Sequence, residues 1–171
     1  MNKKVETILN KQIAGEASSS HLYLAMASWA ENAGLNGTAK FLYRQSDEER
    51  EHMLKLVKFV NERGGQAIIP DLSIGKISFS SLKAVFTELL NHEIGVTASV
   101  NEVVHVCLQE KDYTTHNFMQ WYVSEQLEEE AMARSILDKL NLIDNDKGGL
   151  YLFDRDLDTI QAEITAEQQL N

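Results

Sequence analysis

The chain has 171 residues, 43% of them hydrophobic and 25% charged, which is typical of a single globular domain with a substantial core. The formal net charge of -10 disfavours general binding to the phosphate backbone of nucleic acids. No apolar run approaches the roughly 20 residues that cross a bilayer, and the N-terminus lacks a signal-peptide core. The single Cys107 cannot form an internal disulfide. We therefore expect a cytoplasmic protein that binds neither nucleic acid nor membranes.

Two amphipathic stretches open the chain. From about residue 5 to residue 33, side chains on one helix face recur every three or four positions: Leu9, Ile13, Glu16, Ser20, Tyr23 and Ala27. A turn at residues 34–37 precedes a second helix, which we expect from about residue 38 to residue 63, where Gly64 and Gly65 end it. Pro70 and Gly75 then mark a long connection to about Ser80.

The third predicted helix opens at a cap from Ser80 or Ser81 and has the most regular apolar face: Leu82, Phe86, Leu89, Glu93, Val96, Val100, Val103 and Cys107. A short break at residues 110–112 leads to a fourth helix with the inner face Met119, Tyr122, Gln126, Glu129, Ala133, Ile136 and Leu140. Residues 141–149 are predicted to be a loop. A shorter helix at about residues 150–160 and a polar tail to residue 171 complete the chain.

The lengths of the connections predict the topology. Short turns make the first and second helices, and the third and fourth, antiparallel neighbours. The middle connection of about 15 residues can extend to roughly 50 Å, whereas a helix of about 27 residues is roughly 40 Å long. It can therefore run along the whole bundle. We predict an all-α fold, a four-helix bundle with one long crossover and a short fifth C-terminal helix, as a single domain over residues 1–171.

Each long helix carries acid or amide groups on its inner face near its middle: Glu16, Glu49 with His52, Glu93, and Gln126 with Glu129. An isolated buried carboxylate costs several kcal/mol even after relaxation, and a group of them repel unless they bind protons or cations. Glu49 and His52 stand one helical turn apart, so both can reach the same metal ion. Oxygen ligands with one nitrogen suit iron or manganese better than copper. The alternative is that these residues are ordinary surface acids. That alternative does not explain why the acid and amide groups of all four long helices lie at the same depth along the bundle.

Four segments resemble the iron-centre motifs of bacterial non-haem ferritins, at residues 16–24, 47–53, 91–93 and 125–130. The resemblance extends over nearly the full chain and implies that the predicted fold is a ferritin-like four-helix bundle. It implies that one iron ion is bound by Glu16, Glu49 and His52, and that a second is bound by Glu49, Glu93 and Glu129. Glu49 would bridge the two ions.

The same resemblance implies further roles. Gln126 would lie beside the dioxygen pocket among the metal-binding residues, and Tyr23 would hydrogen-bond or donate an electron near the iron pair. A core tyrosine with a satisfied hydroxyl is an equal alternative for Tyr23. Glu48, Glu125 and Glu128 match a third iron site in similar proteins, although an acidic run is more often a solvated face.

The sequence also departs from related di-iron bundles. Bacterioferritins have a second Glu-x-x-His motif on the fourth helix, where this chain has Gln126 and Glu129, and a haem-binding Met where this chain has Arg50. We therefore expect an asymmetric iron centre and no haem. The fifth helix argues against the mini-ferritins that protect DNA.

The resemblance implies a ferroxidase that oxidises Fe(II) with dioxygen or hydrogen peroxide and stores ferric mineral inside a homo-oligomeric cage of twenty-four subunits. One alternative is a di-iron oxidase that scavenges peroxide without storing mineral. Another is a helical interaction module whose inner acids form hydrogen-bond networks. That module would need partners for its carboxylates, and the chain has only 16 Lys and Arg residues.

Overall fold

The computed structural model describes residues 1–75 and 77–168, with side chains described up to Leu157. Within these residues the chain forms five helices and no strand: α1 (Lys3–Asn32), α2 (Asn36–Glu62), α3 (Leu82–Gln109), α4 (Tyr113–Ile143) and α5 (Lys147–Gln168). None of these described helices is long and apolar enough to span a bilayer. The predicted all-α class is confirmed.

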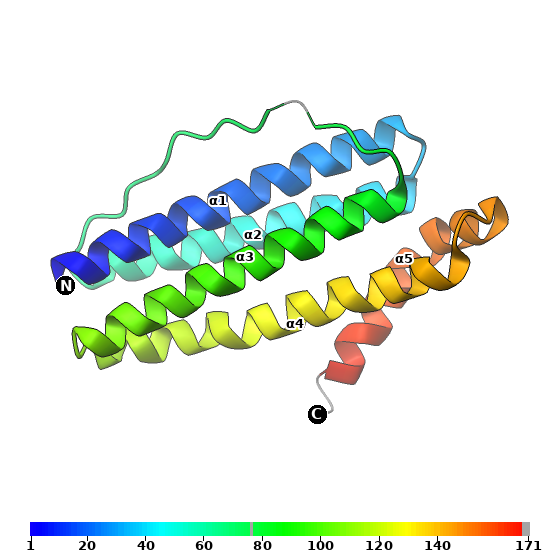
Figure 1. Cartoon of the computed structure of the whole chain (residues 1–171). Coiled ribbons are helices and arrows are strands. Elements are labelled where there is room, and N and C mark those ends of the chain that lie inside the picture. Colours follow the sequence, from blue (N-terminus) through cyan, green and yellow to red (C-terminus); the bar gives the residue numbers. More distant parts are fainter. Residues whose placement is uncertain (76, 169–171) are drawn as a thin grey trace.

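The four long helices form the bundle that the connection lengths predicted (Figure 1). α1 and α2 are joined by a tight turn and pack as one antiparallel pair, and α3 and α4 form the other. The long connection between α2 and α3 passes along the outside of the bundle, so α3 starts at the opposite end from the point where α2 stops. α2 and α3 are therefore parallel.

Side-chain caps fix where three of the helices begin. Asn2 accepts a hydrogen bond from the backbone N–H of Lys4 at the start of α1, and Ser81, not Ser80, caps α3. Asp112 accepts from the backbone N–H of Thr115 at the start of α4. The carboxylate of Asp112 also accepts two hydrogen bonds from the guanidinium of Arg63 at the end of α2, both 2.9 Å long.

The last helix is longer than the sequence pattern predicted. We expected a loop at residues 141–149 and a helix at about 150–160, but α4 continues to Ile143 and α5 already starts at Lys147. Gly148 and Gly149 lie in the first turn of α5, where the Asp146 carboxylate accepts from the N–H of Gly149. The expected polar tail is helical up to Gln168, and residues 169–171 lie outside the described residues.

α5 is attached to the bundle at the N-terminus of α2. Asp154 accepts hydrogen bonds from the backbone N–H groups of Gly37 and Thr38, at 3.1 and 2.8 Å, and from the Thr38 hydroxyl at 2.7 Å. Leu35 gives α2 no side-chain cap, so Asp154 supplies from α5 the acceptor that a capping residue would provide. α5 contacts both α2 and α4.

The bundle core consists of two apolar clusters separated along the helices. One cluster, around Phe41, Phe86 and Ile136, also packs against Phe153 and Leu157 of α5. The other, around Leu9, Leu56 and Met119, occupies the opposite end. The buried polar residues near the helix centres lie in sequence between the members of these clusters on all four helices: Glu16, Glu49, His52, Glu93, Gln126 and Glu129. The bundle therefore has a polar middle between two apolar ends.

The close contact between α2 and α5 predicts that Gly37→Ala destabilises the protein. A Cβ atom at residue 37 would overlap the backbone carbonyl of Asp154, so α5 must shift and its hydrogen bonds to α2 lengthen. We expect the free energy of unfolding to fall by about 1–3 kcal/mol, measured by urea denaturation. Gly95→Ala in α3 is the control. Its Cβ meets open space, and the better helix propensity of alanine should stabilise by roughly 0.5–1 kcal/mol.

Candidate metal centre

Three predicted ligands meet in the middle of the bundle. Glu16 on α1 and Glu49 and His52 on α2 are all buried, and one ligand atom from each lies within 4.8 Å of the others. The Nδ1 atom of His52 is 3.7 Å from Oε2 of Glu49 and 4.0 Å from Oε2 of Glu16. Two carboxylate oxygens and one imidazole nitrogen therefore point to a common position.

The carboxylate oxygens that face this position have no hydrogen-bond partner. Oε2 of Glu16 and Oε2 of Glu49 are among the few buried side-chain atoms, in the described part of the chain, that accept or donate no hydrogen bond. Buried oxygens without a partner are rare in folded proteins because they lose the solvation that water gave them. A divalent cation would satisfy both oxygens together, so the residues present fit a metal ion.

Glu93 lies beside this group and is held by neutral donors. The Tyr23 hydroxyl donates a hydrogen bond to its Oε1, and the amide of Gln126 donates to its Oε2 at 3.0 Å. Tyr23, Glu93 and Gln126 come from three different helices, α1, α3 and α4. The structure therefore brings together Tyr23, Glu93 and Gln126, three of the residues that the resemblance placed at or near the iron pair.

Burial makes the four inner carboxyls hard to ionise without a cation. It raises the pKa of Glu16 and Glu93, and it raises the pKa of Glu49 and Glu129 well above the ordinary value. Repulsion from Glu16 and Glu93 adds to the shift in the pKa of Glu49, and repulsion from Glu93 adds to that of Glu129. Glu93 and Glu129 are not part of the tight Glu16, Glu49 and His52 group, but they interact with Glu49 through their charges.

His52 is available as a neutral ligand. Burial lowers its pKa to about 4. The charge of Glu48 raises this pKa, and the charge of Lys55 lowers it. The Tyr122 hydroxyl donates to the backbone carbonyl of His52 at 2.8 Å, and the Trp121 ring packs edge-on against the imidazole with centroids 5.0 Å apart. An unprotonated imidazole with a fixed ring is the form that binds metal.

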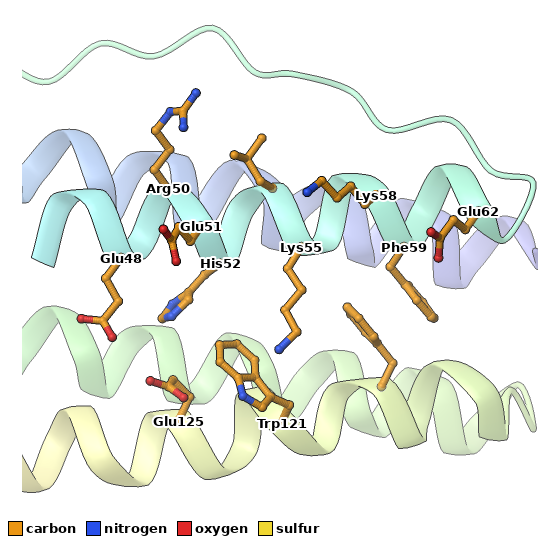
Figure 2. Close-up of a pocket in the computed structure, with 12 residues that line it drawn as sticks. Glu48, Arg50, Glu51, His52, Lys55, Lys58, Phe59, Glu62, Trp121 and Glu125 are labelled. Carbon is orange, nitrogen blue, oxygen red and sulfur yellow. The ribbon is translucent and has the colours of Figure 1, made fainter. Parts of the chain in front are cut away.

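A second group of possible ligands lies next to the first, in a cavity of about 750 Å³ between α2 and α4 (Figure 2). Ligand atoms of Glu48, His52 and Glu125 approach within 4.8 Å of one another there. Burial raises the pKa of Glu125 to about 7, and the charges of Glu48 and Glu128 act in the same direction. Glu128, the third residue of the predicted site, is exposed and is not part of the tight group.

Several neighbours of the centre were not predicted from the sequence. Gln12 donates a hydrogen bond to Oε1 of Glu16 at 2.8 Å, and Gln45 donates to Glu48 at 2.8 Å. The Lys55 ammonium lies 3.1 Å above the Trp121 ring centroid in the cavity of Figure 2. The spacing of four residues between Gln12 and Glu16 was a usable signal, because such pairs share a helix face. The contact between Lys55 and Trp121 joins two helices and has no local signal.

Comparison with known proteins identifies the family. The model of the ferritin-like domain family matches residues 6–143, which include every residue of the metal centre. The chain belongs to the ferritin family. A probable bacterial non-heme ferritin-like protein of Haemophilus influenzae is 42% identical over 95% of this chain and 99% of its own length. The bacterial non-heme ferritin of Campylobacter jejuni is 41% identical over 91% of this chain and 93% of its own.

Solved ferritin structures have the same fold as this ferritin. An open-pore ferritin from the archaeon Archaeoglobus fulgidus matches with a TM-score of 0.90 and 41% identity, covering 92% of this chain and 96% of its own. The Chlorobium tepidum ferritin matches with a TM-score of 0.83 and 39% identity, again over 92% of this chain and 96% of its own. The resemblance found in the sequence motifs is thereby confirmed.

The raised carboxyl pKa values predict that the metal-free ferritin loses stability as pH rises. Above the ordinary glutamate pKa of 4.5, the folded state keeps protons on Glu16, Glu49, Glu93 and Glu129 that the unfolded state releases. The free energy of unfolding must then fall with increasing pH. His52 opposes this between about pH 4 and 6.5, and His92 acts in the same direction, because burial lowers the pKa of both. The four carboxyl groups nevertheless retain more protons than the two imidazoles give up.

Glu49→Gln tests this pH dependence. It removes one of the retained protons, so the slope should become shallower by up to about 1.4 kcal/mol per pH unit. Urea denaturation at pH 5, 6.5 and 8, at fixed protein concentration, measures the slope. A metal-free wild type whose stability rises from pH 6.5 to 8 would contradict the raised pKa values.

Proposed function

We propose that this ferritin is a ferroxidase that oxidises Fe(II) to Fe(III) and stores the ferric product as mineral inside a protein cage. The observation that carries the proposal is the convergence of three metal-binding atoms, Oε2 of Glu16, Oε2 of Glu49 and Nδ1 of His52, in the middle of the bundle. The family membership and the named relatives support it.

The substrate is a pair of Fe(II) ions. One ion is bound by Glu16, Glu49 and His52, and the other by Glu49, Glu93 and Glu129, with Glu49 shared. Each Fe(II) loses one electron. A dioxygen molecule takes up the two electrons with two protons to give hydrogen peroxide, or a hydrogen peroxide molecule takes them up with two protons to give two water molecules. Four carboxylates favour the more highly charged Fe(III) product over Fe(II).

Gln126 and Tyr23 support the second site. Both donate hydrogen bonds to Glu93 and so fix the orientation of its carboxylate. Burial raises the pKa of Tyr23 well above its ordinary value, so its hydroxyl keeps its proton and stays a donor. The hydrogen bond from Tyr23 to Glu93 also places the phenol beside a ligand of the pair, which supports a role as an electron donor.

A third iron ion binds beside the pair, at Glu48 and Glu125 with Glu128 nearby. The grouping of Glu48 and Glu125 with His52 supports this site. The raised pKa of Glu125 supports it too, because the charges of Glu48 and Glu128 add to the main effect, which is burial. The site opens into the cavity between α2 and α4, which offers ions a route toward the pair (Figure 2).

Storage requires a closed shell, and we propose a homo-oligomer of twenty-four copies in the cytoplasm. Several large apolar side chains are exposed in the single chain and suit contacts between subunits: Leu24, Ile68, Ile69, Tyr113 and Leu127. The membership in the ferritin family supports a cage. We propose no haem, nucleic-acid or membrane partner.

An anaerobic Fe(II) titration followed by exposure to oxygen tests the proposal. We expect two to three tight Fe(II) sites per chain, a rapid rise in ferric absorbance, and a large assembly that fills with mineral. Glu49→Ala should lower the oxidation rate at least about 100-fold, because it removes the ligand shared by both ions.

Glu88→Ala, an exposed acid of α3, is the matched control and should oxidise iron at the wild-type rate. Rapid oxidation by a small oligomer that forms no mineral would contradict storage. A wild type that binds no Fe(II) would refute the whole function.

A further inference from the structure

The side chain of Gln12 lies between the metal centre and α3. It is 1% exposed, and its Nε2 atom donates to Oε1 of Glu16 at 2.8 Å. Its Oε1 atom accepts a hydrogen bond from the Ser99 hydroxyl at 2.6 Å. Gln12 and Glu16 belong to α1 and Ser99 belongs to α3, so the chain of hydrogen bonds ties one metal ligand to a second helix.

The direction of these hydrogen bonds follows from the donor and acceptor chemistry. An ionised carboxylate only accepts, so the Gln12 amide must turn its nitrogen toward Glu16. Its carbonyl oxygen then faces Ser99, and the Ser99 hydroxyl must donate to it. When Glu16 carries its charge, no other orientation of the amide satisfies all three groups.

The hydrogen bonds of Gln12 and Ser99 leave Glu16 with one free oxygen. Oε1 is held by Gln12, whereas Oε2 has no partner and lies 4.0 Å from Nδ1 of His52. A carboxylate without such a bond can rotate or bind a metal through both oxygens. We propose that Ser99 and Gln12 are positioning residues that present Glu16 to the metal through Oε2 alone.

The inference rests on the proposed function and deepens it. A buried amide is costly unless both of its ends are bonded, and an apolar side chain would fill this place on α1 without needing Ser99. Both ends of the Gln12 amide are bonded here, so its burial is tolerated, but packing alone does not require an amide at this place. A single-oxygen ligand also leaves one more position of the metal open, and an oxidant needs such a position.

Binding of Co²⁺ to the assembled, metal-free ferritin tests the proposal without any redox reaction. Calorimetric titration gives the affinity, and the visible absorption of Co²⁺ reports the number and arrangement of its ligands. We expect Gln12→Leu to weaken Co²⁺ binding at one site roughly tenfold and to change the absorption spectrum of that site. A tenfold loss is at the lower end of what removing a hydrogen-bond partner of a metal ligand costs.

Variants of Ser99 separate positioning from simple packing. Ser99→Ala should weaken the same site less than Gln12→Leu, and Ser99→Thr, which keeps the hydroxyl, should restore wild-type binding. The double variant should bind Co²⁺ as Gln12→Leu does, because Ser99 acts only through Gln12. Ser19→Ala is the matched control. It removes another buried hydroxyl between α1 and α3, bonded to His92 at 2.7 Å, and should leave Co²⁺ binding unchanged.

Folded Gln12→Leu with wild-type Co²⁺ affinity and absorption would overturn the proposal. If that variant does not fold, Ser99→Ala decides, and wild-type binding by it would overturn the proposal equally. A wild type that binds no Co²⁺ would refute the proposed function as well. Tight binding by the wild type with unaffected variants would refute the positioning role alone.

Discussion

The structure depends on how four carboxyl groups are accommodated in the middle of one helical bundle. Glu16, Glu49, Glu93 and Glu129 are each at most 5% exposed, and burial raises the pKa of every one of them. The apolar clusters on either side supply the hydrophobic stabilisation that permits such a layer. The arrangement is stable and ionised only when cations share the core, so metal binding and stability are linked.

Neutral donors divide the carboxylate oxygens into held and free ones. Gln12, Tyr23 and Gln126 hold one oxygen of Glu16 and both of Glu93, whereas the free oxygens of Glu16 and Glu49 face His52. Under the proposed function, this division gives the cluster of acids a defined position for a metal ion. It also gives the two halves of the centre different surroundings, which suits the asymmetric centre expected from Gln126 and Glu129.

Helical periodicity was enough to predict the bundle, its crossover and the inner position of the acids, because each depends on spacing within one helix or on connection length. The start of α5 was predicted too late, because Gly148 and Gly149 are typical of a loop. In the structure the Asp146 carboxylate caps the helix whose first turn contains these residues. The partnership of Gln12 with Ser99 and the stacking of Lys55 on Trp121 join different helices. Such contacts depend on how the helices pack, and periodicity in a single sequence carries no information about them.

We propose that the inner carboxylates and His52 form a site for two iron ions. The most direct measurement is anomalous X-ray diffraction at the iron edge from crystals exposed to Fe(II) without oxygen. We expect two iron peaks per chain about 3.5–4 Å apart, both bound to Glu49 and one of them also bound to Glu16 and His52. Iron found only at surface acids, with no peak between Glu16 and His52, would contradict it.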